Sequence, residues 1–187
     1  NVHVKQLDVT DEDALASAID AIDTIDIVIP AAGISVADRE HEMNVFDKVI
    51  SINLSAVMRT CSLAKAKMPM GGSMVLIASM YSTFGAGGRP AYAASKGGIV
   101  QLVKSLAQSY APDGIRVNAV APGWIDTPLL APLKADKDIS GAILGRTPLA
   151  RFGDPEEIAK VASFLCSDHA SFVTGATLPV DGGYLTV

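Results

Sequence analysis

The chain has 187 residues, 49% of them hydrophobic and 19% charged, which is typical of a compact domain and argues against disorder. Its formal net charge of −5 offers no basic surface and argues against nucleic acid as a partner. No apolar stretch approaches the ~18 residues of a membrane span, so no membrane partner is expected.

The cysteine and histidine residues of the sequence support neither a metal site nor a disulfide framework. Neither Cys61 nor Cys166 stands at metal-ligand spacing, and the three histidines add none. Two such cysteines form no disulfide framework, which favours a reducing, cytoplasmic location. We therefore expect no metal. No signal peptide precedes the first expected strand, although the chain starts at Asn1 without a methionine.

The first third of the chain predicts strands alternating with a helix. The expected elements are a strand from Val2 to Leu7, a helix capped by Thr10 or Asp11 and running to about Ala21, and a strand from Ile25 to Ile29. The last of these is a continuous β-branched run, which is typical of a parallel strand covered on both faces.

The remainder continues the alternation. Met43 to about Met68 carries apolar residues at helical spacing, with Asn53 near its middle. The elements expected after it are a buried strand at Ser73–Ser79, a helix from Ala91 to about Tyr110, a strand at Arg116–Ala121, a helix from Asp154 to about Cys166, and a strand at Thr177–Val180.

This alternation predicts an α/β fold with a doubly wound, Rossmann-like parallel sheet, right-handed crossovers and helices on both faces, in a single domain over residues 1–187. Ligands of such sheets bind beyond the carboxyl ends of the strands. Asp8, Gly33, Ser79 and the pair Pro122-Gly123 all fall at those ends.

Tyr92 and Lys96 share one face of the expected helix, because they stand four residues apart. Moving a phenol pKa from ~10 to about 7 takes roughly 4 kcal/mol, which a close cation in a partly dry site can supply. Such a tyrosine could act as an acid or base on an alcohol or ketone. The alternative is a solvated helix face.

Two further polar residues stand at informative places. Ser79 ends a strand, so its hydroxyl can donate a hydrogen bond to a substrate oxygen, although it could equally belong to an ordinary turn. Asn53 is unfavourable inside a helix, which suggests a role, although a solvent-facing asparagine is the simpler interpretation.

The order Asn53, Ser79, Tyr92, Lys96, followed by the stretch from Gly114 to Pro128, resembles the classical short-chain dehydrogenases/reductases over the whole chain. The resemblance implies hydride transfer between the nicotinamide of NAD or NADP and a small-molecule secondary alcohol or ketone, with sugars and polyols among the open substrates. It implies that Tyr92 exchanges the proton, Lys96 lowers the tyrosine pKa and binds the nicotinamide ribose, Ser79 orients the oxygen, and Asn53 holds a water of a proton relay.

The resemblance also implies a set of cofactor contacts. The residues that it assigns are Asp8 and Val9 at the adenine, Ala32 and Gly33 near the ribose, Tyr92 and Lys96, the turn Pro122-Gly123, the backbone of Ile125 at the carboxamide, and the Thr127 hydroxyl near a phosphate. Ordinary loop chemistry explains Pro122-Gly123 equally well, and Asp8 as a helix cap would need no ligand.

The chain departs from the family pattern in two places. Pro30-Ala31 stands where the family usually has two asparagines, so side-chain amides that brace the sheet are missing. The glycine-rich phosphate turn is also absent, and Gly85 to Pro90 does not replace it. The chain thus looks like a family member lacking its first strand–helix unit and the following strand. A catalytically silent remnant that acts as a scaffold is the rival hypothesis.

We expect the stretch from Leu129 to Arg151 to form a substrate lid over a pocket lined by Met80, Tyr81 and Trp124. Its apolar residues, Leu129, Leu130, Leu133, Ile139, Ile143 and Leu144, could instead pack against the domain. The family resemblance implies a homo-oligomer, a dimer or tetramer, paired through the two long helices. Small residues of the second helix, Ala93, Ala94, Gly97 and Gly98, would permit either subunit pairing or packing within one subunit.

Overall fold

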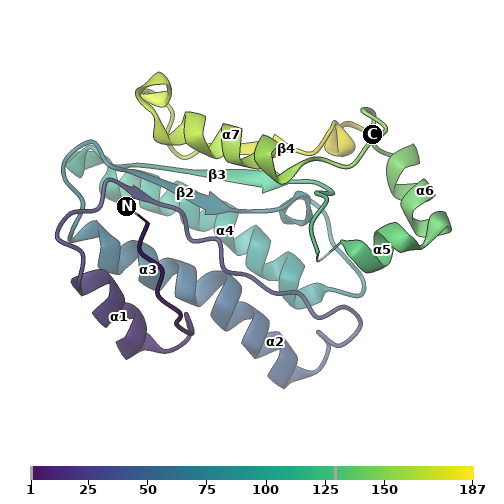
Figure 1. The fold of residues 1–187 in the computed structure, drawn as a ribbon, viewed down its shortest axis with the longest axis horizontal. Helices are drawn as coiled ribbons and strands as arrows, with labels where there is room; N and C mark the ends of the chain where they lie inside the picture. The colour runs from purple at the N-terminus through teal and green to yellow at the C-terminus, as the bar shows by residue number, and fades with distance from the viewer. Residues whose placement is uncertain (1, 129) are drawn as a thin grey trace.

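The computed structural model describes residues 2–128 and 130–187. In this part of the chain a four-stranded parallel sheet has helices on both faces (Figure 1), which confirms the expected doubly wound, Rossmann-like fold. The strands lie in the order β1 (Ile27–Val28), β2 (Ser73–Ile77), β3 (Arg116–Pro122) and β4 (Thr177–Val180). Because all are parallel, their carboxyl ends meet at one edge.

One face of the sheet is covered by two long helical segments. They are α2 (Met43–Ile50), a π-helical turn (Ser51–Ser55) and α3 (Ala56–Lys65) in succession, and α4 (Pro90–Tyr110). Val57 and Ile99 from these helices pack on Leu76 and Val117 of the sheet in one buried cluster. Burial of each such side chain stabilises the fold by about 1.5–3 kcal/mol.

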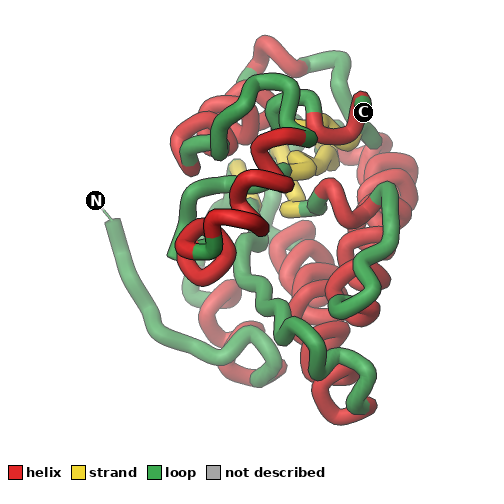
Figure 2. The backbone as a smooth tube through the Cα atoms, turned by 90° about the vertical axis from the view of Figure 1, so that its right-hand side faces the viewer, coloured by secondary structure: helices red, strands yellow, loops and turns green. Residues whose placement is uncertain are grey.

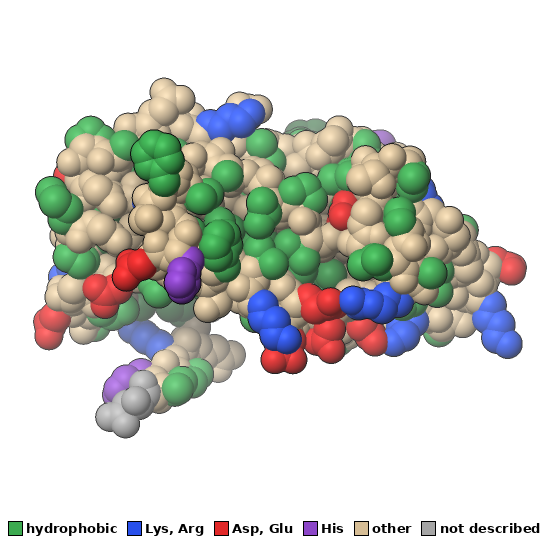
Figure 3. Space-filling view, turned by 90° about the horizontal axis from the view of Figure 1, so that it is seen from above, with side chains coloured by type: hydrophobic (Ala, Val, Ile, Leu, Met, Phe, Trp, Pro, Cys, Tyr) green, Lys and Arg blue, Asp and Glu red, His purple; other side chains and the backbone are tan. Residues whose placement is uncertain are grey.

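The opposite face carries helix α7 (Pro155–Cys166), which packs through Ala162 and Leu165 on Val75 and Val120. The helix begins as expected, because Asp154 and Glu157 form a reciprocal capping box at its start. Figure 3, seen from above, shows hydrophobic side chains spread over this side of the molecule.

The last crossover of the sheet contradicts one expectation. β2, β3 and β4 are added in one direction, yet α4 lies on one face and α7 on the other. Helices on opposite faces give crossovers of opposite hand, so the right-handed rule cannot hold for all of them. The connection from β3 passes through α5 (Ala131–Ala135) and α6 (Lys137–Gly145) before α7, so the strand does not feed directly into its packing helix.

The expected strand at Val2–Leu7 is absent from the structure. Val2 and Val4 are 90% and 91% exposed, and the segment forms an arm that lies away from the body in Figure 2. A strand requires a hydrogen-bonded neighbour, and no described strand pairs with this segment. Helix α1 (Glu12–Asp20) follows as expected, and the Asp11 side chain caps it by accepting a hydrogen bond from the Ala14 N–H.

Strand β1 is shorter and less covered than expected. Ile27 is 49% exposed and Ile29 43% exposed, so the interpretation of a strand buried on both faces is wrong here. The reason is the position of α7, which packs mainly on β2 and β3 and leaves one face of β1 open.

The long helix around Asn53 is interrupted. A π-helical turn at Ser51–Ser55 joins α2 to α3, and α3 ends at Lys65 rather than near Met68. A π turn inserts an extra residue and rotates the following side chains, and such turns are frequent at functional sites. Short 3₁₀ helices complete the fold at Met80–Ser82, Ala111–Asp113, Asp168–Ala170 and Tyr184–Thr186.

Within the described ranges, no helix is both long and apolar enough to span a bilayer. Among the same residues, no group of three or more His, Cys, Asp or Glu side chains is arranged to hold a metal ion.

Candidate active site at the carboxyl ends of the strands

A cavity of about 450 Å³ lies beyond the carboxyl ends of β2 and β3. Its walls come from the strand ends, the first turn of α4, helix α5 and the start of α7. The residues that line it include Ser79, Tyr92, Pro122, Gly123, Ile125 and Thr127 from the expected site, with Met80, Tyr81 and Trp124 from the expected pocket.

Ser79 and Tyr92 are brought together as expected. Ser79 follows β2 and is 5% exposed, and its hydroxyl accepts a hydrogen bond from the Tyr81 N–H at 3.2 Å. Tyr92 lies in the first turn of α4, which begins at Pro90. Burial raises the pKa of Tyr92, and the nearby Ser79 hydroxyl opposes part of that rise because it favours the phenolate.

Lys96 lies one turn further along α4, with its Nζ 5.7 Å from the centroid of the Tyr92 ring. The ammonium donates a 2.7 Å hydrogen bond to the carbonyl of Ile77, the last residue of β2. Burial disfavours the charged form and lowers the Lys96 pKa to about 8.

The expected acidic phenol is not found in this structure. Burial raises the pKa of Tyr92 above its ordinary value, although the Ser79 hydroxyl and the charge of Arg89 lower it and the charge of Glu40 raises it further. The Lys96 ammonium is bonded to the Ile77 carbonyl. Burial therefore outweighs the influences that lower the Tyr92 pKa, and the lowering of that pKa by Lys96 stays a prediction.

Asn53 is fully buried, so the solvent-facing interpretation is wrong. Its side chain bonds both backbone groups of Ile34: Nδ2 donates to the carbonyl at 2.8 Å, and Oδ1 accepts from the N–H at 2.9 Å. Nδ2 also lies 3.2 Å from the Ser95 hydroxyl. Asn53 thus ties the π turn to the loop after β1 and to α4, whereas the water relay stays a prediction.

Glu40 is a site residue that the sequence analysis missed. Its carboxylate is fully buried and accepts hydrogen bonds from the Ser35 hydroxyl, the Val36 N–H and, at 2.7 Å, the Tyr92 N–H. It therefore caps the N-terminus of α4 directly beneath the tyrosine, where a negative charge is favoured. Nothing local marks it, because its partners lie up to 52 positions away.

The residues expected near the ribose lie beside Lys96. A Cβ added to Gly33 would stand 3.9 Å from the Lys96 Nζ and 3.4 Å from the Asn53 Oδ1, so the backbone passes close to both groups. Ala31 lines the main cavity and also a second one of about 190 Å³, which contains Ala32 and Val9. Ala31 therefore stands between the two cavities, and Val9 lines the smaller one.

Asp8 does not cap a helix, since Asp11 does. Its carboxylate accepts hydrogen bonds from the N–H and the hydroxyl of Thr10, and the backbone bond is the larger cause of its lowered pKa. The predicted adenine contact of Asp8 and Val9 is not tested by the structure and stays a prediction.

The turn after β3 contributes several residues to the wall of the cavity. Gly123 is needed because a Cβ there would stand 2.7 Å from Asp181, and its N–H donates to the Val180 carbonyl. The residues flanking Ile125 pair with Gly153, but within the described residues neither the N–H nor the carbonyl of Ile125 forms a hydrogen bond. Thr127 lines the same cavity.

The expected lid divides into two parts. Leu130 and Leu133 line the cavity, whereas Ile143 is buried against the domain and Ile139 is 42% exposed. Leu129 lies outside the described residues. Some apolar residues of this stretch thus line the cavity and others pack against the domain, whereas its role as a substrate lid stays a prediction.

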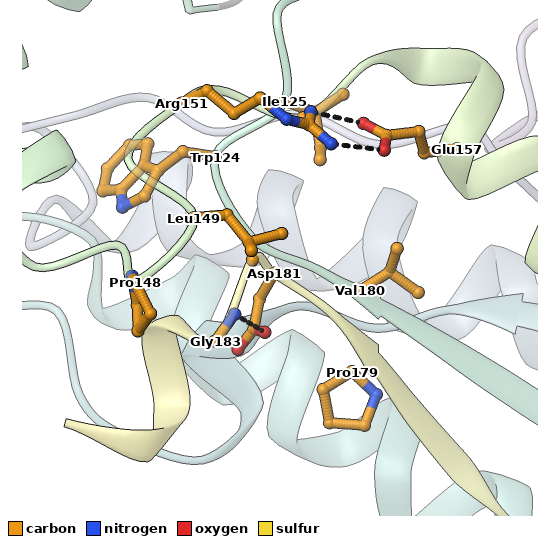
Figure 4. A pocket seen from close by; sticks show the side chains of 12 residues that line it. Trp124, Ile125, Pro148, Leu149, Arg151, Glu157, Pro179, Val180, Asp181 and Gly183 are labelled. Atoms are coloured by element: carbon orange, nitrogen blue, oxygen red, sulfur yellow. Dashed lines mark hydrogen bonds and ion pairs between the residues drawn. The ribbon is translucent and has the colours of Figure 1, made fainter.

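A neighbouring cavity of about 420 Å³ (Figure 4) is also lined by Trp124 and Ile125. At its rim Arg151 forms a bidentate ion pair with Glu157, with N···O distances of 2.8 and 2.7 Å. Glu157 also closes the capping box of α7, so one carboxylate joins the end of the lid to that helix.

A parallel sheet with serine, tyrosine and lysine side chains at its carboxyl edge is the arrangement expected of a short-chain dehydrogenase/reductase, and the chain belongs to that family of oxidoreductases. The family model that matches residues 1–185 is described as enoyl-(acyl carrier protein) reductase. The order and spacing of the site residues in the sequence had carried the same resemblance.

Similarity to individual proteins is also extensive. The chain is 41% identical to the cis-4-hydroxycyclohexanecarboxylate dehydrogenase of Sinomonas cyclohexanicum, over 96% of this chain and 75% of that protein. It is 40% identical to the 2-dehydro-3-deoxy-D-gluconate 5-dehydrogenase of Pseudoalteromonas atlantica, over 96% and 74%.

A solved structure gives the same result. A putative 2-deoxy-D-gluconate 3-dehydrogenase from Agrobacterium tumefaciens, with bound NADP, superimposes with a TM-score of 0.89 at 37% identity, over 98% of this chain and 76% of that one.

Proposed function

We propose that this protein is an NAD- or NADP-dependent oxidoreductase that transfers a hydride between the nicotinamide ring and the carbon of a secondary alcohol or ketone. One observation carries the proposal. The side chains of Ser79 and Tyr92 line the same cavity, and the Lys96 ammonium lies one helical turn beyond Tyr92, 5.7 Å from the centroid of its ring.

The residues present suit the nicotinamide half of the cofactor. Lys96 uses one of its ammonium donors on Ile77, which leaves others for ribose hydroxyls. The backbone N–H and carbonyl of Ile125 match the acceptor and donor of a carboxamide. Bound cofactor would supply or accept the hydride, and the similar Agrobacterium structure holds NADP.

The protein contributes placement and proton transfer. In reduction, the Tyr92 phenol donates its proton to the oxygen of the ketone, and its raised pKa keeps it protonated for this role. The Ser79 hydroxyl lies beside it and can stabilise the negative charge that develops on the same oxygen. In the reverse direction Tyr92 removes the alcohol proton, which requires the Lys96 ammonium to stabilise the phenolate.

Substrates of this site are small alcohols or ketones, with sugars and polyols included. Two similar proteins are named for a hydroxylated cyclohexanecarboxylate and a deoxygluconate. The cavity combines an apolar wall, formed in part by Leu130, Leu133 and Ile158, with the hydroxyl groups of Ser79 and Tyr92. The scaffold hypothesis has no comparable support.

A cofactor titration tests the proposal. NADH and NADPH are added to the purified protein, and binding is followed by the fluorescence of the reduced nicotinamide. Oxidation of the bound form is then measured with a panel of ketones. We expect saturable binding of one cofactor and turnover of at least one ketone. Absence of both would refute the oxidoreductase and favour the scaffold.

We also propose that the protein forms a homo-oligomer through α3 and α4. Gly98 serves packing within the subunit, since a Cβ there would stand 2.9 Å from Leu54. Gly97 meets nothing within 4 Å, which leaves its face of α4 open. A sedimentation experiment that finds only monomers would refute this proposal. The cytoplasmic location stays a prediction from the unpaired Cys61 and Cys166.

A further inference from the structure

Arg89 is the one charged residue among those that line the catalytic cavity in the described part of the chain. It directly precedes α4 and stands three residues before Tyr92. One guanidinium nitrogen donates a hydrogen bond to the Ser35 hydroxyl at 3.2 Å. Within residues 2–128 and 130–187, this is its only side-chain bond, and Arg89 forms no ion pair.

The nearest acid does not neutralise this charge by direct contact. Glu40 accepts from the same Ser35 hydroxyl, and its other bonds go to the backbone N–H groups of Val36 and Tyr92. It is fully buried behind these donors and does not line the cavity. Glu40 therefore holds Ser35 in place, whereas most N–H groups of the Arg89 fork remain available to a ligand.

The electrostatic influence of Arg89 reaches the catalytic phenol. Burial raises the pKa of Tyr92 and of Tyr81, and the positive charge of Arg89 lowers both. Charges interact strongly only when they are close and poorly screened. The charge of Arg89 is therefore felt by the tyrosine side chains that line the same cavity.

The backbone at Arg89 is held rigidly in place. Its N–H donates to the Ala86 carbonyl at 2.9 Å, and the carbonyl of Gly88 accepts from the Asp38 N–H at 2.8 Å. A Cβ on Gly88 would stand 2.6 Å from the Asp38 carboxylate oxygen, so a larger residue there would require the Asp38 side chain to move. The glycine-rich stretch at Gly85–Gly88 therefore positions the arginine, and preorganisation of this kind lowers the cost of binding.

We propose that Arg89 binds a carboxylate of the substrate, and that among alcohols and ketones the protein prefers small hydroxy acids and oxo acids to neutral compounds. This inference rests on the proposed oxidoreductase function. A guanidinium presents parallel N–H groups that match a carboxylate in a bidentate geometry. With no acidic residue among the described lining of the cavity, an anion entering it meets one unopposed positive charge.

The test uses the single tryptophan of the chain, Trp124, which lines the same cavity. Its fluorescence is followed while cyclohexanecarboxylate or the neutral cyclohexanecarboxamide is added to the protein without cofactor. We expect the carboxylate to bind at least tenfold more tightly than the amide, since a tenfold ratio requires about 1.4 kcal/mol. Equal affinity, or no saturable response to the carboxylate, would overturn the proposal.

Arg89→Gln should abolish this preference, and Arg89→Lys should retain part of it, because the charge remains while the planar fork is lost. Arg39→Gln is the matched control: Arg39 pairs with Glu42 on the surface, with a side chain 62% exposed, and lies outside the cavity lining. An Arg89→Gln protein that folds and still prefers the carboxylate would refute the assignment.

Measurements of turnover distinguish a failure of the Arg89 proposal from a failure of the proposed oxidoreductase function. A protein that binds the carboxylate through Arg89 but oxidises no hydroxy acid would contradict the oxidoreductase alone. A protein that transfers hydride, but whose Arg89→Gln variant keeps the same ratio of kcat/KM for a hydroxy acid over its neutral amide, would contradict the role of Arg89 alone.

Discussion

The ammonium of Lys96 donates a 2.7 Å hydrogen bond to the carbonyl of Ile77, at the carboxyl end of β2. The helix and the strand that carry the candidate active site are thereby joined by a buried charge, since Lys96 is 5% exposed. The same bond directs the ammonium to the strand rather than to the phenol. We therefore expect ligand binding, rather than the fold alone, to complete the acid–base system.

Lys96 should make the stability of the ligand-free protein depend on alkaline pH. Burial lowers its pKa from 10.5 to about 8. Below pH 8 the folded protein therefore carries a buried ammonium, whose desolvation lowers the free energy of unfolding. Between pH 8 and 10.5 only the unfolded chain still holds the proton, and stability must rise with pH across that window.

The measurement is urea unfolding of the wild type and of Lys96→Met at several pH values. The wild type should gain stability relative to the variant between pH 8 and 10.5. Lys104→Met, at an exposed position of the same helix, serves as control and should show no such gain. A pH-independent difference between wild type and Lys96→Met would show that the lysine is not held in a destabilised charged form.

Tyr92→Phe should abolish turnover and preserve the fold. Loss of a general acid or base typically lowers the rate by about 10²–10⁴-fold, and the phenyl ring still fills the same volume. Initial rates of NADH or NADPH consumption and far-ultraviolet circular dichroism check the two halves. Tyr110→Phe makes the same chemical change outside the cavity lining and should leave the rate unchanged. A Tyr92→Phe protein that retains activity would rule out Tyr92 as the proton donor.

Asn53→Ala should destabilise the protein by roughly 2–4 kcal/mol, because it leaves the N–H and the carbonyl of Ile34 without their side-chain partners. Asn44→Ala, at an exposed position of α2, should change stability far less. Denaturant unfolding compares the two. Equal losses would mean that the bonds from the π turn to the loop after β1 contribute nothing to stability.

Glu40→Ala should lower the free energy of unfolding by roughly 2–4 kcal/mol. The substitution leaves the buried donors of Ser35, Val36 and Tyr92 without an acceptor and removes the cap of α4. Glu42→Ala, two residues later, removes an exposed carboxylate whose partner is Arg39, and should cost much less. The comparison is again made by denaturant unfolding. A loss for Glu40→Ala no larger than that for Glu42→Ala would contradict the capping role.

Glu157 should contribute to acid sensitivity. The Arg151 guanidinium first, and then the Asp154 N–H, lower its pKa from 4.5 to about 2. A carboxyl group with a lowered folded pKa stabilises the protein above pH 4.5, and this contribution is lost as the pH falls toward 2.

The test compares the thermal stability of the wild type, Glu157→Gln and Glu156→Gln between pH 5 and pH 2. The Glu157 variant should lose less stability than the wild type on acidification, whereas the neighbouring Glu156, whose contact with Lys160 spans 3.6 Å at the surface, should follow the wild type. Parallel acid profiles for all three proteins would be inconsistent with a functioning Arg151–Glu157 pair.

The sequence predicted those features that depend on neighbours along the chain. Pro90 at the first position of α4 and the capping box of Asp154 mark helix starts through bonds within a few residues. The β-branched and apolar runs marked β2 and β3 because a buried strand has no polar face. Ser79 and Tyr92 could therefore be placed at one edge of the sheet from the sequence alone.

Other features depended on partners far away in the sequence. Residues 2–7 alternate like a strand, but no described strand pairs with them. The Lys96 pKa and its bond to Ile77 follow from how deeply α4 packs on β2, which no local pattern encodes. The opposite hand of the last crossover arises from the long path through α5 and α6.

The sequence by itself determined which residues are candidates for the chemistry and on which elements they lie, because periodicity, caps and turns act over a few positions. Only the tertiary structure decided the pKa values and the charge interactions of these residues. Glu40 reaches the Tyr92 N–H across 52 positions, and Arg89 meets Ser35 across 54. Burial and long-range hydrogen bonds set the energy of each charge, and both exist only when the chain is folded.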